Sequence, residues 1–247
     1  MRKAPKTPSR KRNMAEGIAR TLRVKILGGE YRPGDRLPTE TSLAEDFGVN
    51  RATLREAIKK LEMLGLVTVQ QRTGIHVRDY WQDSGLELLS FLVEAAVEKD
   101  TLDLALLEDL LEARRFFYAE IARLAAIRAK PESLALLDAA VDEVLRADEA
   151  ASFLAADLSV VQILARASGN LAIRLVFNSF VTLYRDHFDL FTAFYVTGIE
   201  ARKGFYVELR DHVHAGRAPE VSRLVATTFE EEDARILAVA RALTGDI

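Results

Sequence analysis

The 247-residue sequence contains no cysteine and only four histidines. The lack of cysteine excludes disulfide bonds, thiolate zinc sites and a cysteine nucleophile, and it fits a reducing compartment. No apolar run approaches the roughly 20 residues that a helix needs to cross a bilayer. The basic N-terminus lacks the apolar core of a signal peptide. We therefore expect a cytoplasmic protein without a membrane partner.

The usual sequence features of an enzyme are also missing. The chain has no glycine-rich phosphate loop and no combination of histidine, aspartate and serine that suits nucleophilic catalysis. The few histidines offer little general-base chemistry. The sequence therefore predicts a protein that is not an enzyme.

Charge is distributed unevenly along the chain. Residues 1–78 carry 17 Lys/Arg and 8 Asp/Glu, a net of +9, whereas residues 79–247 carry 17 and 29, a net of −12. The basic part is the candidate for a polyanion partner. Residues 1–13 hold six Lys/Arg and no acid, which predicts a basic disordered tail. This tail either keeps the protein in solution or contacts phosphates.

Residues 14–78 show the pattern of a winged helix-turn-helix domain. One helical face over residues 14–27 is followed by the short segment TETSLAEDF and by a third helix that starts after Asn50 and ends at Gly65. The β-prone runs LVTVQ and IHV then flank a glycine-containing turn, as in a hairpin. The expected buried face of the third helix consists of Ala52, Leu54, Ile58, Leu61 and Leu64.

Beyond Trp81 the strand pattern disappears and helical periodicity continues to the end of the chain. The expected helices cover residues 82–98, 101–129, 131–150, 152–167, 170–191, 198–215 and 219–243. The sequence therefore predicts a mainly α protein, with an N-terminal winged helix-turn-helix and a C-terminal all-helical bundle of about seven helices.

The third helix carries the strongest candidates for nucleic-acid contacts. Arg51 and Arg55 are four residues apart and share a helix face. In a helix-turn-helix the front of this helix enters the major groove, where arginine can donate two hydrogen bonds to guanine. We predict that both arginines contact DNA, flanked by Asn50, Ala52 and Thr53. The alternative is that they are ordinary solvent-facing charges.

The tip of the hairpin is a second candidate. Gln71, Arg72 and Thr73 lie there, and an arginine on a wing can reach into a minor groove. The alternative is a solvated turn.

The segments GGEYRPGDRLPTETSLAEDFGVNRATLREAIKKLEMLGLVTVQ and GIHV resemble the DNA-binding domain of the GntR family of bacterial transcription regulators. This resemblance implies a homodimer that binds double-stranded DNA at an inverted-repeat operator.

The sequence departs from the family pattern at three of the expected DNA-contact positions. Thr41 stands where members often have an arginine that contacts DNA, Gln71 where FadR-type members have histidine, and Arg72 where glycine is usual.

The remainder is similar to the all-helical effector domain of the FadR type, through RDYWQDSGLELLSFLVE, ASGNLAIRLVFNSFVTLYRDHF and GFYVELRDHVHAG. The resemblance implies that residues 79–100 form a linker and the first effector helix. It implies that residues 101–247 form the effector-binding and dimerisation domain. In this branch the effector is a long-chain acyl-CoA, and the resemblance implies no other cofactor.

The same resemblance suggests where the effector binds. It places effector contacts at Arg114, Tyr184, Phe191, Tyr206, Phe229, Glu232 and Ile236. A glutamate near CoA phosphates would repel them, so the alignment slips there, the ligand sits differently, or the effector has changed. Arg114 could instead form a salt bridge with Glu112 or Glu120, and the two tyrosines could simply pack in the core.

Many relatives hold a metal ion through an aspartate, a histidine four residues later and two further histidines. Asp157 matches the first ligand, but Val161 cannot ligate, and the other two positions align near Arg202 and at Glu230. We therefore expect no metal site.

The resulting hypothesis is a ligand-responsive transcription regulator, a repressor of fatty-acid metabolism that a long-chain acyl-CoA releases from its operator. Two alternatives stay open: a GntR-family regulator that answers a different small carboxylate or other metabolite, and a DNA-binding protein whose helical domain only dimerises.

Overall fold

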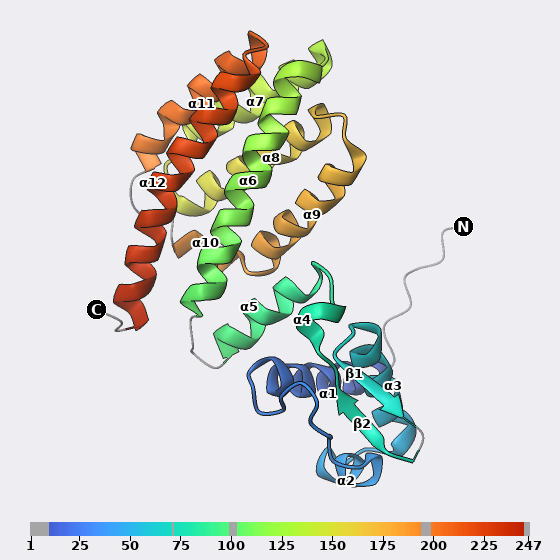
Figure 1. Ribbon diagram of the computed structural model, residues 1–247. Coiled ribbons are helices and arrows are strands. Elements are labelled where there is room, and N and C mark those ends of the chain that lie inside the picture. Colours follow the sequence, from blue (N-terminus) through green and yellow to red (C-terminus); the bar gives the residue numbers. More distant parts are fainter. Residues whose placement is uncertain (1–9, 71, 99–102, 194–198, 245–247) are drawn as a thin grey trace. The chain divides into compact units, whose positions relative to one another are not determined.

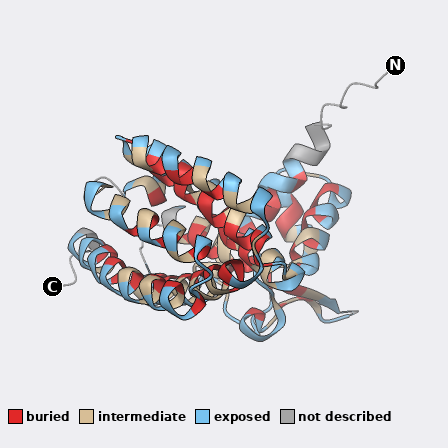
Figure 2. Cartoon of the chain, turned by 90° about the horizontal axis from the view of Figure 1, so that it is seen from above, coloured by how far each residue is buried: buried red, intermediate tan, exposed pale blue. Residues whose placement is uncertain are grey.

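In the computed structural model of the chain, which describes residues 10–70, 72–98, 103–193 and 199–244, two compact units are present (Figure 1). The first comprises Met1–Thr101 and the second Leu102–Ile247. Each unit has its own buried core (Figure 2).

The N-terminal unit is a winged helix-turn-helix followed by two further helices. Its elements are α1 (Arg10–Leu27), α2 (Glu40–Asp46), α3 (Arg51–Met63), β1 (Val67–Gln70), β2 (Gly74–Val77), α4 (Tyr80–Asp83) and α5 (Leu88–Glu98). The two strands are antiparallel, with Val67 opposite Val77 and Gln70 opposite Gly74. Helix α1 begins at Arg10, so residues 10–13 of the expected tail are helical. Residues 1–9 lie outside the described residues.

Capping residues and glycines fix the ends of the two helices of the helix-turn-helix. The Thr39 hydroxyl accepts a hydrogen bond from Ser42 N at 3.2 Å, and the Asn50 side chain accepts one from Thr53 N at 2.9 Å. Gly48 and Gly65 have φ of 61° and 73°. Only glycine adopts such values without strain, which ends α2 and α3 sharply.

The apolar face of α3 packs against α1. Leu54, Ile58 and Leu61 are buried, as expected from their spacing. The expectation for Ala52 was wrong, because Ala52 is exposed, and Leu64 is only partly buried. Ala57 lies on the buried face, since the helical spacing continues from Leu54 through Ala57 to Leu61.

The helix expected over residues 82–98 is interrupted. Helix α4 ends at Asp83, and α5 starts only at Leu88. Helix α5 packs against α1 within the N-terminal unit. The side chain of Arg23 on α1 lies over the Phe91 ring at 3.9 Å and bonds to Glu94 at 2.6 Å. The segment expected to be the first effector helix therefore supplies the carboxylate that this buried arginine requires.

The C-terminal unit is an all-helical bundle. Its described residues form seven helices: α6 (Leu104–Arg128), α7 (Pro131–Arg146), α8 (Ala150–Ala167), α9 (Leu171–Asp186), α10 (Phe188–Ala193), α11 (Ile199–His214) and α12 (Ala218–Thr244). The single helix expected over residues 170–191 breaks at His187 into α9 and α10. Helices α6 and α12 lie side by side along most of their length (Figure 1).

Helix α8 passes through the core of this bundle. Phe153, Leu154, Val160 and Leu164 on it are fully or almost fully buried. By length and composition alone α8 could cross a membrane, but half of the helix is buried inside the unit. A core helix of a globular protein has these same properties.

Candidate DNA-binding surface and effector site

The front of α3 presents two arginines to solvent. Arg51 and Arg55 are both exposed, as is the capping residue Asn50. Thr53 is only 2% exposed, and its hydroxyl donates to Asn50 Oδ1 at 3.2 Å. Its side chain therefore supports the cap of the helix in the free protein, and a DNA contact by Thr53 stays a prediction.

Arg55 has an acidic partner that the sequence did not reveal. Its Nε donates to Glu40 Oε2 at 2.8 Å. Glu40 is the first residue of α2 and lies 15 positions earlier in the chain, so the spacing within α3 does not indicate this pair. Thr41, beside it, is exposed on the same helix.

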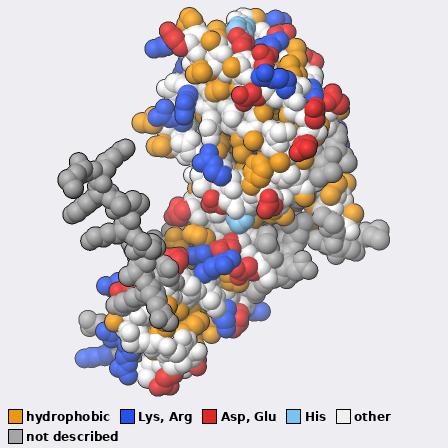
Figure 3. Space-filling model, turned by 180° about the vertical axis from the view of Figure 1, so that it is seen from behind, with side chains coloured by type: hydrophobic (Ala, Val, Ile, Leu, Met, Phe, Trp, Pro, Cys, Tyr) orange, Lys and Arg blue, Asp and Glu red, His pale blue; other side chains and the backbone are white. Residues whose placement is uncertain are grey.

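The wing adds a second basic region. Arg72 is exposed and has a φ of 75°, and the Thr73 hydroxyl donates to Gln70 Oε1 at 2.9 Å. Gln71 lies outside the described residues. Figure 3 shows Lys and Arg side chains gathered at one end of this unit, beside a few acidic ones.

Arg36 belongs to this region although sequence reasoning missed it. It pairs through a β-bridge with His76. A Cβ atom at Gly74 would lie only 3.0 Å from Arg36 Nε. Glycine at this position therefore lets the Arg36 guanidinium lie directly against the wing, and the isolated bridge gives no periodic signal in the sequence.

The helical unit contains a small internal cavity of about 20 Å³. Three of the predicted effector contacts line it: Arg114 from α6, Tyr184 from α9 and Phe229 from α12. The rest of its wall is mainly apolar, formed by Tyr118, Asp157, Leu158, Val161, Phe177, Phe180 and Val181. This volume suffices for about one water molecule.

Two predicted contacts lie beside the cavity and one lies elsewhere. Phe191 stacks on Tyr184, with ring centroids 4.0 Å apart. Tyr206 contacts Asp157, which lines the cavity. Ile236 instead packs in a separate cluster with Leu107, Leu111 and Ala240, partly covered by Leu104 and Leu237.

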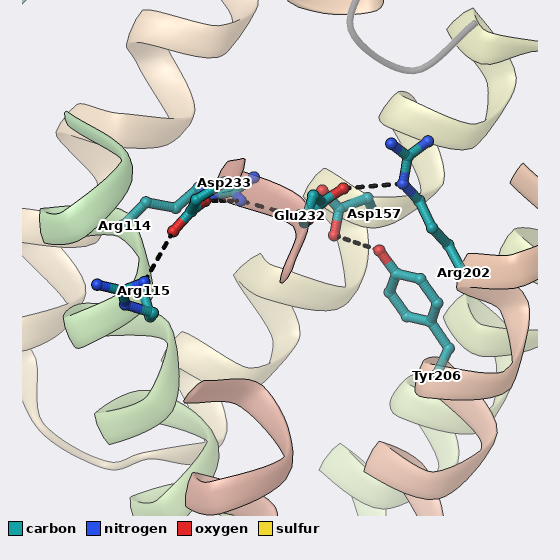
Figure 4. Close-up of polar contacts among 7 residues, drawn as sticks. All are labelled: Arg114, Arg115, Asp157, Arg202, Tyr206, Glu232 and Asp233. Carbon is teal, nitrogen blue, oxygen red and sulfur yellow. Dashed lines mark hydrogen bonds and ion pairs between the residues drawn. The ribbon is translucent and has the colours of Figure 1, made fainter. Parts of the chain in front are cut away.

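A buried ionic cluster that includes the cavity residue Arg114 connects three helices of the unit (Figure 4). Arg114 Nη2 lies 2.8 Å from Asp233 Oδ1 and 3.3 Å from Glu232 Oε2. Arg202 Nε lies 2.8 Å from Glu232 Oε1, and Arg115 contacts Asp233 at 3.3 Å. The cluster thus connects α12 to α6 and α11 through carboxylates that are each only 6% exposed.

The partners proposed for Arg114 from its own helix were wrong. Glu120 pairs with Arg123 at 2.7 Å, and Glu112 is exposed. Glu232 and Asp233 lie more than a hundred residues away along the chain. They reach Arg114 because burial of a guanidinium demands paired carboxylates, and α12 supplies them.

Asp157 lies near this cluster and accepts a hydrogen bond from the Tyr206 hydroxyl at its Oδ1, at 2.9 Å. Burial raises the pKa of Asp157 from its ordinary value of 3.8 to about 6, against the opposing effect of the Tyr206 hydrogen bond. Arg202, near a position where relatives have a metal-ligating histidine, forms an ion pair with Glu232, whereas Glu230 is exposed. Among the described residues, no group of three or more His, Asp or Glu could hold a metal ion.

Tyr118 is a cavity residue with a polar group that sequence reasoning missed. Its side chain is 2% exposed, and its ring packs edge-on against Phe229 at 4.7 Å. Its buried hydroxyl has no hydrogen-bond partner within the described part of the chain. Burial raises its pKa well above the ordinary value, so the hydroxyl is a neutral donor at the cavity wall.

A winged helix-turn-helix with exposed arginines, joined to a separate helical unit that has a cavity, defines a DNA-binding transcription regulator. Comparison with known families agrees. Residues 14–77 match the bacterial regulatory proteins of the gntR family, and residues 78–243 match the FadR C-terminal domain. The chain belongs to the gntR family and carries a FadR C-terminal domain. It is a transcription regulator and not an enzyme.

Individual relatives support this assignment. An uncharacterized HTH-type transcriptional regulator of Mycobacterium tuberculosis is 39% identical over 170 residues, which cover 69% of this chain and 68% of the relative. The fatty acid metabolism regulator protein of Klebsiella pneumoniae is 31% identical over 225 residues, 90% of each chain. A solved structure of Lar, described as controlling the Listeria monocytogenes agr system, has the same fold, with a TM-score of 0.57 at 19% identity; the match covers 94% of this chain and 98% of that one.

Proposed function

We propose that this protein is a dimeric, ligand-responsive regulator of fatty-acid metabolism in the cytoplasm. It binds an inverted-repeat operator through Arg51 and Arg55 of α3 and through the wing, and a long-chain acyl-CoA releases it. The effector is proposed to enter the helical unit between α6, α8, α9 and α12. Similarity to the fatty acid metabolism regulator of Klebsiella pneumoniae, over 90% of both chains, supports the choice of effector.

The composition of the cavity wall carries the proposal. Aliphatic and aromatic side chains form most of the wall, and its few residues with polar groups are Arg114, Asp157, Tyr118 and Tyr184. An apolar wall with a few convergent polar groups is typical of small-molecule sites. It suits a ligand with a long apolar chain and a polar or anionic head.

Binding requires the helical unit to open. The cavity of about 20 Å³ is far below the roughly 300–1,000 Å³ of typical ligand pockets. An anionic head that approaches Arg114 also competes with Glu232 and Asp233, which already occupy its guanidinium. Displacement of these carboxylates would loosen α12 from α6. A ligand that binds only the opened form then shifts the population toward it.

A small carboxylate is the second candidate effector. The small cavity favours it, because a compact anion would need less separation of the helices than an acyl chain. The same arginine would receive its carboxylate.

Tyr118→Phe provides a test of the site, measured by calorimetry with palmitoyl-CoA. The change removes a hydroxyl that forms no hydrogen bond with a described residue, so we expect the melting temperature to stay the same or rise. If the effector accepts a hydrogen bond from this hydroxyl, its affinity falls roughly 3- to 10-fold. Palmitate, coenzyme A and short dicarboxylates serve as separate arms. Binding of a dicarboxylate alone would select the second candidate, and binding of none would leave the helical domain with dimerisation only.

A further inference from the structure

The ion pair between Glu40 and Arg55 is unexpected on a DNA-binding surface. Glu40 Oε2 lies 2.8 Å from Arg55 Nε, and the side chains are 28% and 62% exposed. DNA phosphates repel a carboxylate, so an acid beside the recognition helix weakens non-specific binding. Charge repulsion alone therefore predicts that loss of Glu40 would strengthen binding to every DNA sequence.

The geometry of the pair suggests a different role. Glu40 bonds to Nε, on the side of the guanidinium. The two terminal nitrogens, Nη1 and Nη2, form no hydrogen bond with any other residue that the structure describes. These terminal nitrogens form the fork that can donate two parallel hydrogen bonds to guanine O6 and N7.

Arg51, one turn earlier on the same face, provides a contrast. It is exposed, and the structure gives it no ion pair among the described residues. A long unpaired side chain samples many rotamers and loses that freedom when DNA immobilises it. Arg55 is already restricted by a carboxylate at the start of α2, where Thr39 caps the helix and fixes its first turn.

We propose that Glu40 is a positioning residue for sequence readout. Its carboxylate holds the Arg55 guanidinium by the Nε edge, so that the Nη fork is presented to a base edge in a fixed direction. Glu40 thereby increases discrimination between operator and other DNA while it lowers the affinity for DNA in general. The proposal depends on operator binding by α3 and is independent of the identity of the effector.

The test compares Kd values for two duplexes of equal length by fluorescence anisotropy at one salt concentration. One is the duplex that the wild-type protein selects from a random pool, and the other has the same base composition in scrambled order. Glu40→Gln keeps the size of the side chain and removes its charge. We expect operator affinity to fall roughly 5- to 100-fold per half-site and scrambled-duplex affinity to stay the same or rise.

Glu30→Gln is the matched control. Glu30 is an exposed acid of the same unit that pairs with Lys25 at 2.9 Å. Its removal should change both affinities by the same small factor. The ratio of the two Kd values comes from one protein preparation, so partial unfolding of a variant does not alter it.

A double-mutant cycle tests whether Glu40 acts through Arg55. In the Arg55→Gln background, Glu40→Gln should leave the specificity ratio, which is the scrambled-duplex Kd divided by the operator Kd, unchanged. The proposal is overturned if Glu40→Gln still lowers this specificity ratio in that background. It is also overturned if Glu40→Gln alone shifts both affinities equally, downward or upward, because Glu40 then affects only phosphate contacts.

Discussion

Substitution of Asp157 by asparagine should remove a pH-dependent destabilisation from the helical unit. Asp157 is 8% exposed and accepts a hydrogen bond from Tyr206 at 2.9 Å. Asparagine has a similar size, and its Oδ1 can accept the same hydrogen bond. The variant therefore differs from the wild type mainly in that it cannot ionise.

The direction of the effect follows from the raised pKa of Asp157. Its pKa of about 6 in the folded protein, against an ordinary 3.8, means that the folded state holds the proton more tightly than the unfolded chain. The favourable contribution of protonated Asp157 to the stability of the fold is complete below pH 3.8 and is lost as the pH rises through about 6. The difference between these pKa values corresponds to about 3 kcal/mol.

We therefore expect Asp157→Asn to be more stable than the wild type at pH 7.5, by up to about 3 kcal/mol. The difference should shrink as the pH falls from 7 toward 4. Urea unfolding followed by circular dichroism at several pH values measures this, and hydrogen exchange of the α8 amides locates it. A stability difference that is independent of pH, or a variant that is less stable at pH 7.5, would show that ionisation of Asp157 does not destabilise the helical unit.

Three further substitutions test other parts of the structure. Asn50→Ala removes the cap of α3 and should destabilise the N-terminal unit by about 1 kcal/mol, which hydrogen exchange of the α3 amides would reveal; full protection would contradict it. Phe153→Ala, at a position that is 0% exposed, should destabilise the helical unit by about 3–5 kcal/mol in urea unfolding, and a loss below 1 kcal/mol would count against the described core. Arg51→Ala should lower operator affinity at least about tenfold and leave the heat-stability shift with palmitoyl-CoA unchanged, whereas operator binding equal to the wild type would rule out the role of Arg51.

The helix-turn-helix could be predicted from the sequence because its signals are local. Thr39 and Asn50 each cap a helix three residues before the amide that they bind, and glycines end the helices at once. Helical periodicity also located the described helices of the second unit, apart from the break at His187. The turn that separates α4 from α5 also has a local signal, the dipeptide Ser84-Gly85, which the expectation of one helix over residues 82–98 did not take into account.

The polar contacts of the candidate sites could not be predicted in the same way. Glu40 reaches Arg55 across the turn of the helix-turn-helix, and Asp233 reaches Arg114 across the bundle. Pairs of this kind depend on which helices pack together, and spacing within one helix contains no information about that. The sequence likewise does not indicate that the Tyr118 hydroxyl lacks a hydrogen-bond partner among the described residues, because a buried tyrosine hydroxyl usually has one.

The central claim is that an acyl-CoA controls DNA binding through the helical unit. The most direct measurement is the Kd of the selected operator duplex with and without micromolar palmitoyl-CoA, with coenzyme A as the control. We expect palmitoyl-CoA to raise this Kd at least about tenfold and coenzyme A to leave it unchanged. An operator Kd that stays constant with medium-chain and long-chain acyl-CoAs, roughly 8 to 18 carbons, would contradict control of DNA binding by an acyl-CoA.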